Sequence, residues 1–142
     1  MTVRVLIICS ANVCRSPLAE AFLQVLLPDA NVSSAGLYAI EGKPLDPVIA
    51  SLLLNQGIDR RSHRSRRAEL DVLEQADLIL TMESVQKYEV ERCFPETRGK
   101  VFCFDLQQDV PDPYGKNAKT YEVVTIQIAS HSENWARRIK LL

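Results

Sequence analysis

Four short apolar segments recur along the chain, and helical patterns separate them. Val3 to Ile8, Asn31 to Ala35, Asp77 to Met82 and Lys100 to Phe104 each predict a strand, since such runs are short and bounded by polar or turn residues. The first is rich in β-branched residues, as a strand buried on both faces should be. Strands that alternate with helices indicate parallel pairing, so we expect a doubly wound α/β fold with a four-stranded parallel sheet and helices on both faces.

Start and stop signals place the first two helices. Ser16 followed by proline predicts an N-cap and a proline at the first helical position, which begins a helix over 17–27. Asp46 followed by proline repeats this signal, and Gly57 is a suitable stop.

The second half of the chain has weaker signals. Ser84 is expected to cap the helix after the third strand, and two prolines and a glycine predict a loop over Val110 to Gly115. The final segment has a β-branched run that also suits a strand, but its apolar period favours a helix. That face comprises Tyr121, Val124, Ile128, Trp135 and Ile139.

Composition excludes several classes of protein. The 142 residues suggest one domain over 1–142, and a formal net charge of −1 gives no basic field for nucleic acid. The densest basic stretch, Arg60 to Arg67, is interpreted as a solvated loop face. The apolar run Val5 to Ile8 is too short for a signal peptide or a membrane span. We therefore expect a cytoplasmic protein without membrane insertion.

The four cysteines predict thiol chemistry or burial, because a reducing compartment disfavours disulfide frameworks. They lie at 9, 14, 93 and 103, and form no close C-x2-C pair. The two histidines, at 63 and 131, do not complete a ligand set. No metal and no cofactor are therefore expected.

The segment between the first strand and the first helix carries the candidate chemistry. It reads CSANVCRS, and ligands of such folds bind at the carboxyl ends of the strands. Consecutive N–H groups in this turn and the helix N-terminus would attract an anion and favour the thiolate of Cys9, a nucleophile. Arg15 could grip two phosphate oxygens with its planar fork. Cys-x5-Arg alone is a weak pattern, and Cys9 could simply end a buried strand, but the strand–turn–helix context strengthens the catalytic interpretation.

The loop together with its flanking residues reads VLIICSANVCRSPLAE. This segment resembles the low-molecular-weight protein tyrosine phosphatases, whose loop reads C-x-G-N-x-C-R-S. SAGL at 34–37, GIDRRSH at 57–63, DLILTME at 77–83, RGKV at 98–101 and DPYG at 112–115 follow in the family's order, so the resemblance covers nearly the whole chain. It is greatest to the bacterial branch that dephosphorylates tyrosine kinases of capsule and exopolysaccharide export.

The resemblance implies a role for each matching residue. Cys9 is then the nucleophile and Arg15 the phosphate clamp, while Asp112 is the general acid that later takes a proton from water. Activity on aryl phosphates would be highest on the acidic side, where Asp112 is protonated and Cys9 is ionised. The phosphate-binding loop comprises Cys9, Ser10, Ala11, Asn12, Val13, Cys14, Arg15 and Ser16.

Other roles also follow from the resemblance. Asn12, Ser16, Ser34 and His63 support the loop, and Ser16 also assists departure of the sulfur. Tyr114 and Ile40 form walls of the substrate cleft, and Cys14 forms a reversible disulfide with Cys9 that protects the nucleophile from over-oxidation.

The loop departs from the family at Ala11, where glycine is usual. Alanine at positive φ would cost on the order of 1 kcal/mol, so we expect Ala11 to have negative φ. Only one aromatic residue follows Asp112-Pro113, whereas many relatives have two. The second aromatic residue of those relatives therefore has no counterpart in this chain, and Gly115 stands at its position.

Three alternative functions remain. Arsenate reductases share the loop but need two further cysteines close together, whereas Cys93 and Cys103 are ten residues apart. Protein arginine phosphatases have threonine where this chain has Val13. A phosphate-binding or phosphocarrier domain would need no general acid such as Asp112.

The expected partners are a phosphotyrosine protein substrate, such as a cognate membrane tyrosine autokinase, and phosphate as product or inhibitor. The expected state is a monomer or weak dimer.

Overall fold

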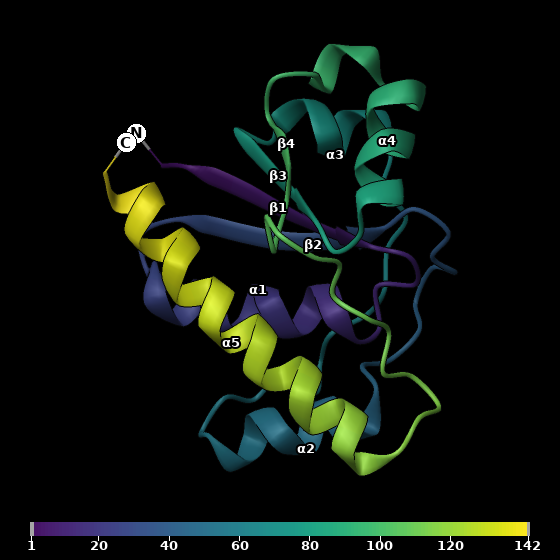
Figure 1. Ribbon diagram of the computed structural model, residues 1–142, viewed down its shortest axis with the longest axis vertical. Coiled ribbons are helices and arrows are strands. Elements are labelled where there is room, and N and C mark those ends of the chain that lie inside the picture. Colours follow the sequence, from purple (N-terminus) through teal and green to yellow (C-terminus); the bar gives the residue numbers. More distant parts are fainter. Residues whose placement is uncertain (1, 142) are drawn as a thin grey trace.

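The computed structural model describes residues 2–141 (Figure 1). Its strands are β1 (Arg4–Cys9), β2 (Asn31–Gly36), β3 (Leu78–Thr81) and β4 (Val101–Cys103). Its α-helices are α1 (Arg15–Leu26), α2 (Pro47–Asn55), α3 (Leu70–Gln75), α4 (Ser84–Cys93) and α5 (Ala118–Lys140), and a 3-10 turn spans Pro95–Thr97.

The four strands form one parallel sheet in the order β2-β1-β3-β4. β1 is therefore central, and Leu6 pairs with Ser33 on one side and with Ile79 on the other. The loops after β1 and β3 leave the same edge of the sheet, because the carboxyl ends of parallel strands lie together. This relationship brings the segments after Cys9 and after Thr81 side by side.

Helices cover both faces of the sheet, as the strand pattern predicted. Val5 and Ile7 belong to the core cluster that includes residues of α1 and α5, whereas Leu6 and Ile8 belong to the cluster of α3 and α4. Figure 1 shows α1 and α5 on one side of the strands and α3 and α4 on the other. The buried alternation along β1 thus separates two apolar layers, as expected of a strand covered on both faces.

Two of the predicted helix caps are wrong. α1 begins at Arg15, so Ser16 lies inside the helix and its hydroxyl bonds elsewhere. α4 is capped by Glu83 rather than Ser84, in a capping box with Gln86. Both serines were predicted as caps from their sequence neighbours alone. Those neighbours do not show which other side chains compete for the N–H groups at the start of each helix.

The prediction for Asp46 is confirmed, because its carboxylate accepts hydrogen bonds from Val48 N and Ile49 N at the start of α2. The final segment is helical throughout Ala118–Lys140 and packs on α1. α3 was not predicted, since its six residues are too few to display a period. Within residues 2–141, no helix is long and apolar enough to cross a membrane.

Candidate active site

The segment between β1 and α1 wraps around the sulfur of Cys9. This side chain is 3% exposed. Its Sγ lies 2.9 Å from Ser16 Oγ and accepts a hydrogen bond from Asn12 N at 3.2 Å. The sulfur is therefore contacted by the middle of the turn and by the first turn of α1, at the carboxyl edge of the sheet where the sequence predicted a ligand to bind.

The side-chain amide of Asn12 decides which way the Ser16 hydroxyl points. Asn12 Oδ1 accepts from Arg66 N at 3.0 Å, which leaves Nδ2 to donate to Ser16 Oγ and to Ser34 Oγ, each at 2.9 Å. Because Ser16 Oγ already accepts from this amide, its own proton is free to point at Cys9 Sγ. The sulfur thus has two hydrogen-bond donors directed at it, Asn12 N and the Ser16 hydroxyl.

A second layer of hydrogen bonds holds Asn12 in place. Ser34 Oγ donates to Glu20 Oε1 at 2.6 Å, and Arg60 pairs with the other oxygen of Glu20 at the same distance. His63 Nε2 donates to the main-chain oxygen of Asn12 at 2.8 Å. The structure thus brings Ser34 and His63 to the loop. Glu20 was missed, although it lies one helical turn after Ser16 in the sequence.

Ala11 does not need the conformational freedom of glycine. Among the non-glycine residues of 2–141, only Asn12 has positive φ, at 60°, so the prediction of negative φ for Ala11 is confirmed. The glycine that the loop requires lies on β2. A Cβ on Gly36 would stand 2.6 Å from Ser10 O, closer than real contacts allow, so Gly36 lets the strand approach the loop.

Arg15 is 3% exposed and held on the side of the cleft away from β2. Its Nη1 donates to Glu83 Oε2 at 2.5 Å and to Val110 O at 2.8 Å, and its Nη2 lies 3.9 Å from Asp112 Oδ2. The guanidinium is therefore fixed by two segments that follow β3 and β4. Glu83 was missed by the sequence interpretation, although it follows a strand adjacent to β1.

Gln86 links α4 to the phosphate-binding loop. Its Oε1 accepts from Met82 N at 3.0 Å and from Glu83 N at 2.9 Å, while its Nε2 donates to Ser10 Oγ at 3.1 Å. The side chain is almost fully buried. It fixes the backbone that carries the Arg15 partner relative to the loop that carries the sulfur.

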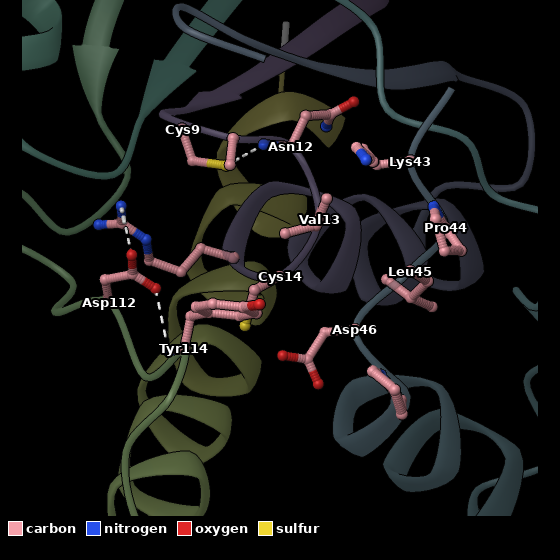
Figure 2. Close-up of a pocket in the computed structure, with 13 residues that line it drawn as sticks. Cys9, Asn12, Val13, Cys14, Lys43, Pro44, Leu45, Asp46, Asp112 and Tyr114 are labelled. Carbon is pink, nitrogen blue, oxygen red and sulfur yellow. Dashed lines mark hydrogen bonds and ion pairs between the residues drawn. The ribbon is translucent and has the colours of Figure 1, made fainter. Parts of the chain in front are cut away.

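A cleft of about 470 Å³ opens above the sulfur. Figure 2 shows Cys9 and Val13 on one side of it, Asp112 and Tyr114 on another, and the 43–46 segment opposite. Ile40 does not line this cleft and is 67% exposed, so the predicted wall is formed instead by later residues of the same loop. The lining residues are Cys9, Ala11, Asn12, Val13, Cys14, Arg15, Lys43, Pro44, Leu45, Asp46, Pro47, Asp112 and Tyr114.

The 110–115 loop presents Asp112 and Tyr114 at the mouth of the cleft. Tyr114 N donates to Asp112 Oδ1 at 3.1 Å, which fixes one carboxylate oxygen, and the other faces Arg15. The Asp112 side chain is about half exposed, so water can reach it from the cleft. Tyr114 is 63% exposed and lines the cleft.

Cys14 is the last residue of the loop before α1 and is as buried as Cys9. Burial, followed by the negative charges of Asp46 and Asp112, raises the pKa of Cys14 well above its ordinary value. Tyr121 Oη donates to Asp46 Oδ2 at 2.7 Å, and burial together with this bond raises the pKa of Tyr121. Both groups are therefore neutral at physiological pH.

The other two cysteines lie apart from the cleft. Cys93 is exposed at the end of α4, and Cys103 is half-buried on β4, 3.9 Å from Thr81 Oγ1. Neither lines the cleft. Across residues 2–141, no three potential ligands cluster in a way that could hold a metal ion.

A buried sulfur in a turn between a strand and a helix, with an arginine fixed beside it on a parallel α/β sheet, is the arrangement of the cysteine-dependent phosphatases. The chain belongs to the family described as low molecular weight phosphotyrosine protein phosphatase, which matches residues 4–141.

Individual relatives are similar over nearly their whole length. A probable low molecular weight protein-tyrosine-phosphatase, EpsP of Ralstonia nicotianae, is 36% identical over 97% of both chains. Among solved structures, the tyrosine phosphatase Wzb from Escherichia coli K30 in complex with sulphate is 30% identical, with a TM-score of 0.92 over 98% of this chain and 99% of that one. The YwlE arginine phosphatase from Geobacillus stearothermophilus is 28% identical, with a TM-score of 0.91 over 98% and 94%.

Proposed function

We propose that the protein hydrolyses phosphotyrosine in proteins through a phosphocysteine intermediate on Cys9. Arg15 and the main-chain N–H groups of the loop bind the phosphoryl oxygens, and Asp112 transfers the protons. The single observation that carries this proposal is the sulfur itself: Cys9 Sγ accepts from Asn12 N and faces Ser16 Oγ in the cleft that Asp112 borders.

In the first step, the Cys9 thiolate attacks phosphorus and the bond to the phenolic oxygen breaks. Asp112, in its protonated form, gives its proton to that oxygen as tyrosine leaves. Arg15 is already oriented by Glu83, so its free N–H groups can hold the equatorial oxygens with little reorganisation.

In the second step, Asp112 is a carboxylate and accepts a proton from a water molecule that attacks the phosphocysteine. Phosphate is released and the sulfur departs as a thiolate, which the Ser16 hydroxyl stabilises by donating a hydrogen bond. Asp112 regains its proton, so the cycle closes with water as the only other reactant.

The substrate class is supported by the apolar surface around the sulfur. Val13 contributes a branched apolar side chain, and Tyr114 and Leu45 lie on facing sides of the cleft. A phenyl ring can pack between such groups. Resemblance to the bacterial branch further supports a cognate membrane tyrosine autokinase as substrate, a cytoplasmic location and a monomer or weak dimer, with phosphate as product and inhibitor.

The experiment compares phosphotyrosine, phosphoserine and phosphoarginine peptides with the wild type and with Cys9→Ser. We expect release of phosphate from phosphotyrosine by the wild type, and loss of turnover with retained oxyanion binding in Cys9→Ser. Full turnover by Cys9→Ser would contradict the mechanism, and arsenate reduction serves as a control for the redox alternative. Cys93→Ser is the matched control, because that exposed thiol is outside the cleft.

Arginine phosphatase activity is the second candidate, since the similar fold of YwlE accompanies that activity. The two candidates differ at position 13, where the arginine phosphatases resembled by this chain have threonine. Val13 lines the cleft and has no polar atom on its side chain to meet a phosphoguanidine group. A preference for phosphoarginine over phosphotyrosine peptides would reverse the assignment.

A further inference from the structure

A polar hollow lies on the α3 side of the sheet, at the amino ends of β1 and β2 and so at the opposite end from Cys9. It is a surface depression of about 230 Å³, lined by the polar residues Arg4, Asn31, Ser33, Arg66 and Gln75, three of them exposed, together with four apolar neighbours. We call it the Arg4–Arg66 hollow. The faces of parallel sheets are usually apolar and covered, so a polar hollow on one calls for an explanation.

The strand register explains how these polar groups gather. Arg4 pairs with Asn31 and Leu6 pairs with Ser33, so the four residues share one face of the sheet. Leu6 belongs to the apolar layer under α3, and the polar positions extend that face past the end of the layer. Across residues 2–141, the side chains of Asn31 and Ser33 make no hydrogen bond, which leaves their donors available.

Arg66 is fixed before any ligand arrives. Its N donates to Asn12 Oδ1 at 3.0 Å, its O accepts from Gly36 N at 2.9 Å, and its Nε donates to Ser34 O at 2.9 Å. These bonds place the guanidinium over the open edge of β2 and leave its two terminal nitrogens unbonded within the described chain. Because the side chain is already ordered, binding loses less conformational entropy.

The two arginine side chains at the hollow have no ion-pair partner among residues 2–141. In the described part of the chain, neither Arg4 nor Arg66 forms an ion pair, and no carboxylate lines the hollow. The nearby Asp77 carboxylate accepts from Arg4 N at 2.8 Å, so it is engaged with main chain.

The C-terminus of α3 also carries less exposed negative partial charge than an uncapped helix end, so it repels an anion less. Lys100 Nζ donates to the main-chain oxygens of Leu73, Glu74 and Ala76, at 2.9, 3.2 and 2.6 Å. These carbonyls would otherwise direct partial negative charge toward the hollow. Lys100 therefore offsets the negative end of α3, and Arg4 and Arg66 are the charged residues that line the hollow.

We propose that the Arg4–Arg66 hollow is a second, non-catalytic site for a free phosphate ion. Two guanidinium groups can hold a tetrahedral dianion from two sides, and the Ser33 hydroxyl and the amides of Asn31 and Gln75 complete its hydrogen bonds. The volume is below the range of about 300–1,000 Å³ typical of small-molecule pockets, which favours a bare ion over a nucleotide. The proposal is independent of the activity assigned to the cleft.

Residue-resolved NMR titration with inorganic phosphate at constant ionic strength tests this proposal. We expect two groups of amide signals, one around Ala11 and Val13 and one around Asn31, Ser33 and Gln75, with separate saturation curves. Absence of a response in the second group, or an equal response to chloride, would refute the second site.

Arg4→Gln provides the decisive variant, because its side chain makes no hydrogen bond in the described chain and its loss should not disturb folding. It should weaken phosphate binding at the hollow by about tenfold or more while the Ala11 and Val13 signals saturate as before. Arg98→Gln, an exposed arginine outside the hollow, is the matched control and should change neither curve. Unchanged binding at the hollow in Arg4→Gln would overturn the assignment.

Discussion

Glu83 forms an ion pair with Arg15: its carboxylate oxygen Oε2 accepts a hydrogen bond from Nη1 of the guanidinium. Arg15 itself lines the cleft. The pair is unequal in exposure, because Arg15 is buried and Glu83 is 28% exposed. A carboxylate in this position restricts the rotamers of the arginine. It also balances a charge that would otherwise be buried alone.

Replacing Glu83 with Gln should lower kcat by about tenfold to a hundredfold, since small displacements of a positioned group can cost this much. KM should change less, because Arg15 retains its charge. Steady-state kinetics with an aryl phosphate measure both constants. Glu89→Gln removes a surface partner of Arg92 and is the matched control; equal kinetics in both variants would show that Glu83 does not position the clamp.

Replacing Asp112 with Asn should slow the enzyme according to the leaving group. The loss should reach about 10²–10⁴-fold for phosphotyrosine, whose phenolate is a poor leaving group, because a general acid contributes this much. For p-nitrophenyl phosphate, whose leaving group needs little protonation, the loss should be much smaller. A uniform loss across a series of aryl phosphates would exclude Asp112 as the acid.

Oxidation of Cys9 should be more fully reversible when Cys14 is present, because a disulfide prevents further oxidation of the sulfenic acid. Peroxide converts Cys9 to a sulfenic acid, which condenses with the Cys14 thiol to form a disulfide and release water. Because the raised pKa of Cys14 keeps it protonated, we expect this condensation to be slow. Recovery of activity by a dithiol after peroxide treatment measures it, and Cys14→Ala should recover less; equal recovery would refute the pairing, and Cys103→Ala is the control.

Asp105 should make the fold sensitive to acid. Burial is the largest single influence and raises its pKa, but hydrogen bonds from Gln107 N, Gln127 and Gln108 N, together with the charge of His131, outweigh it and hold the pKa below the ordinary 3.8. A lowered folded pKa stabilises the protein above the unfolded pKa, and this contribution is lost as pH falls through the folded value.

Urea unfolding of Asp105→Asn against wild type tests this linkage. The variant should be less stable by about 1–3 kcal/mol at pH 7, because charge-assisted hydrogen bonds are lost, and the difference should narrow below the ordinary pKa of 3.8. Glu133→Gln, at an exposed position of α5, should show no such dependence. A constant difference from pH 7 to pH 3 would contradict the assignment.

Periodicity and turn residues sufficed for the four strands and for most of the helices, because these elements bury continuous apolar faces. Cys9 and Arg15 were predicted from the strand–turn–helix context, and Asp112 from the family resemblance. The structure brings all three to the carboxyl edge of the sheet, where parallel sheets place their ligands. Glu83 and Gln86 were not predicted as site residues, because their sequence neighbours carry no signal of a long-range contact. Glu83 contacts Arg15, 68 positions away, and Gln86 contacts Ser10, 76 positions away. The strand order β1 beside β3 is the information that would have identified them.

Errors at Ser16 and Ser84 have a related cause. Each serine lies in the first turn of a helix and could act as a cap, but in the folded chain other residues make the capping contacts. The Ser16 hydroxyl meets a sulfur across the turn, and the Glu83–Gln86 pair caps α4. A pattern that is confined to neighbours in sequence cannot rank such competitors.

Asn12 has a backbone that favours glycine and a side chain that no glycine could replace. Asparagine tolerates a left-handed conformation better than most residues. Its amide also accepts from one partner and donates to two, whereas aspartate would lack the donors. The position is therefore closed to substitution for two unrelated reasons, and a library randomised there should return asparagine alone among active clones.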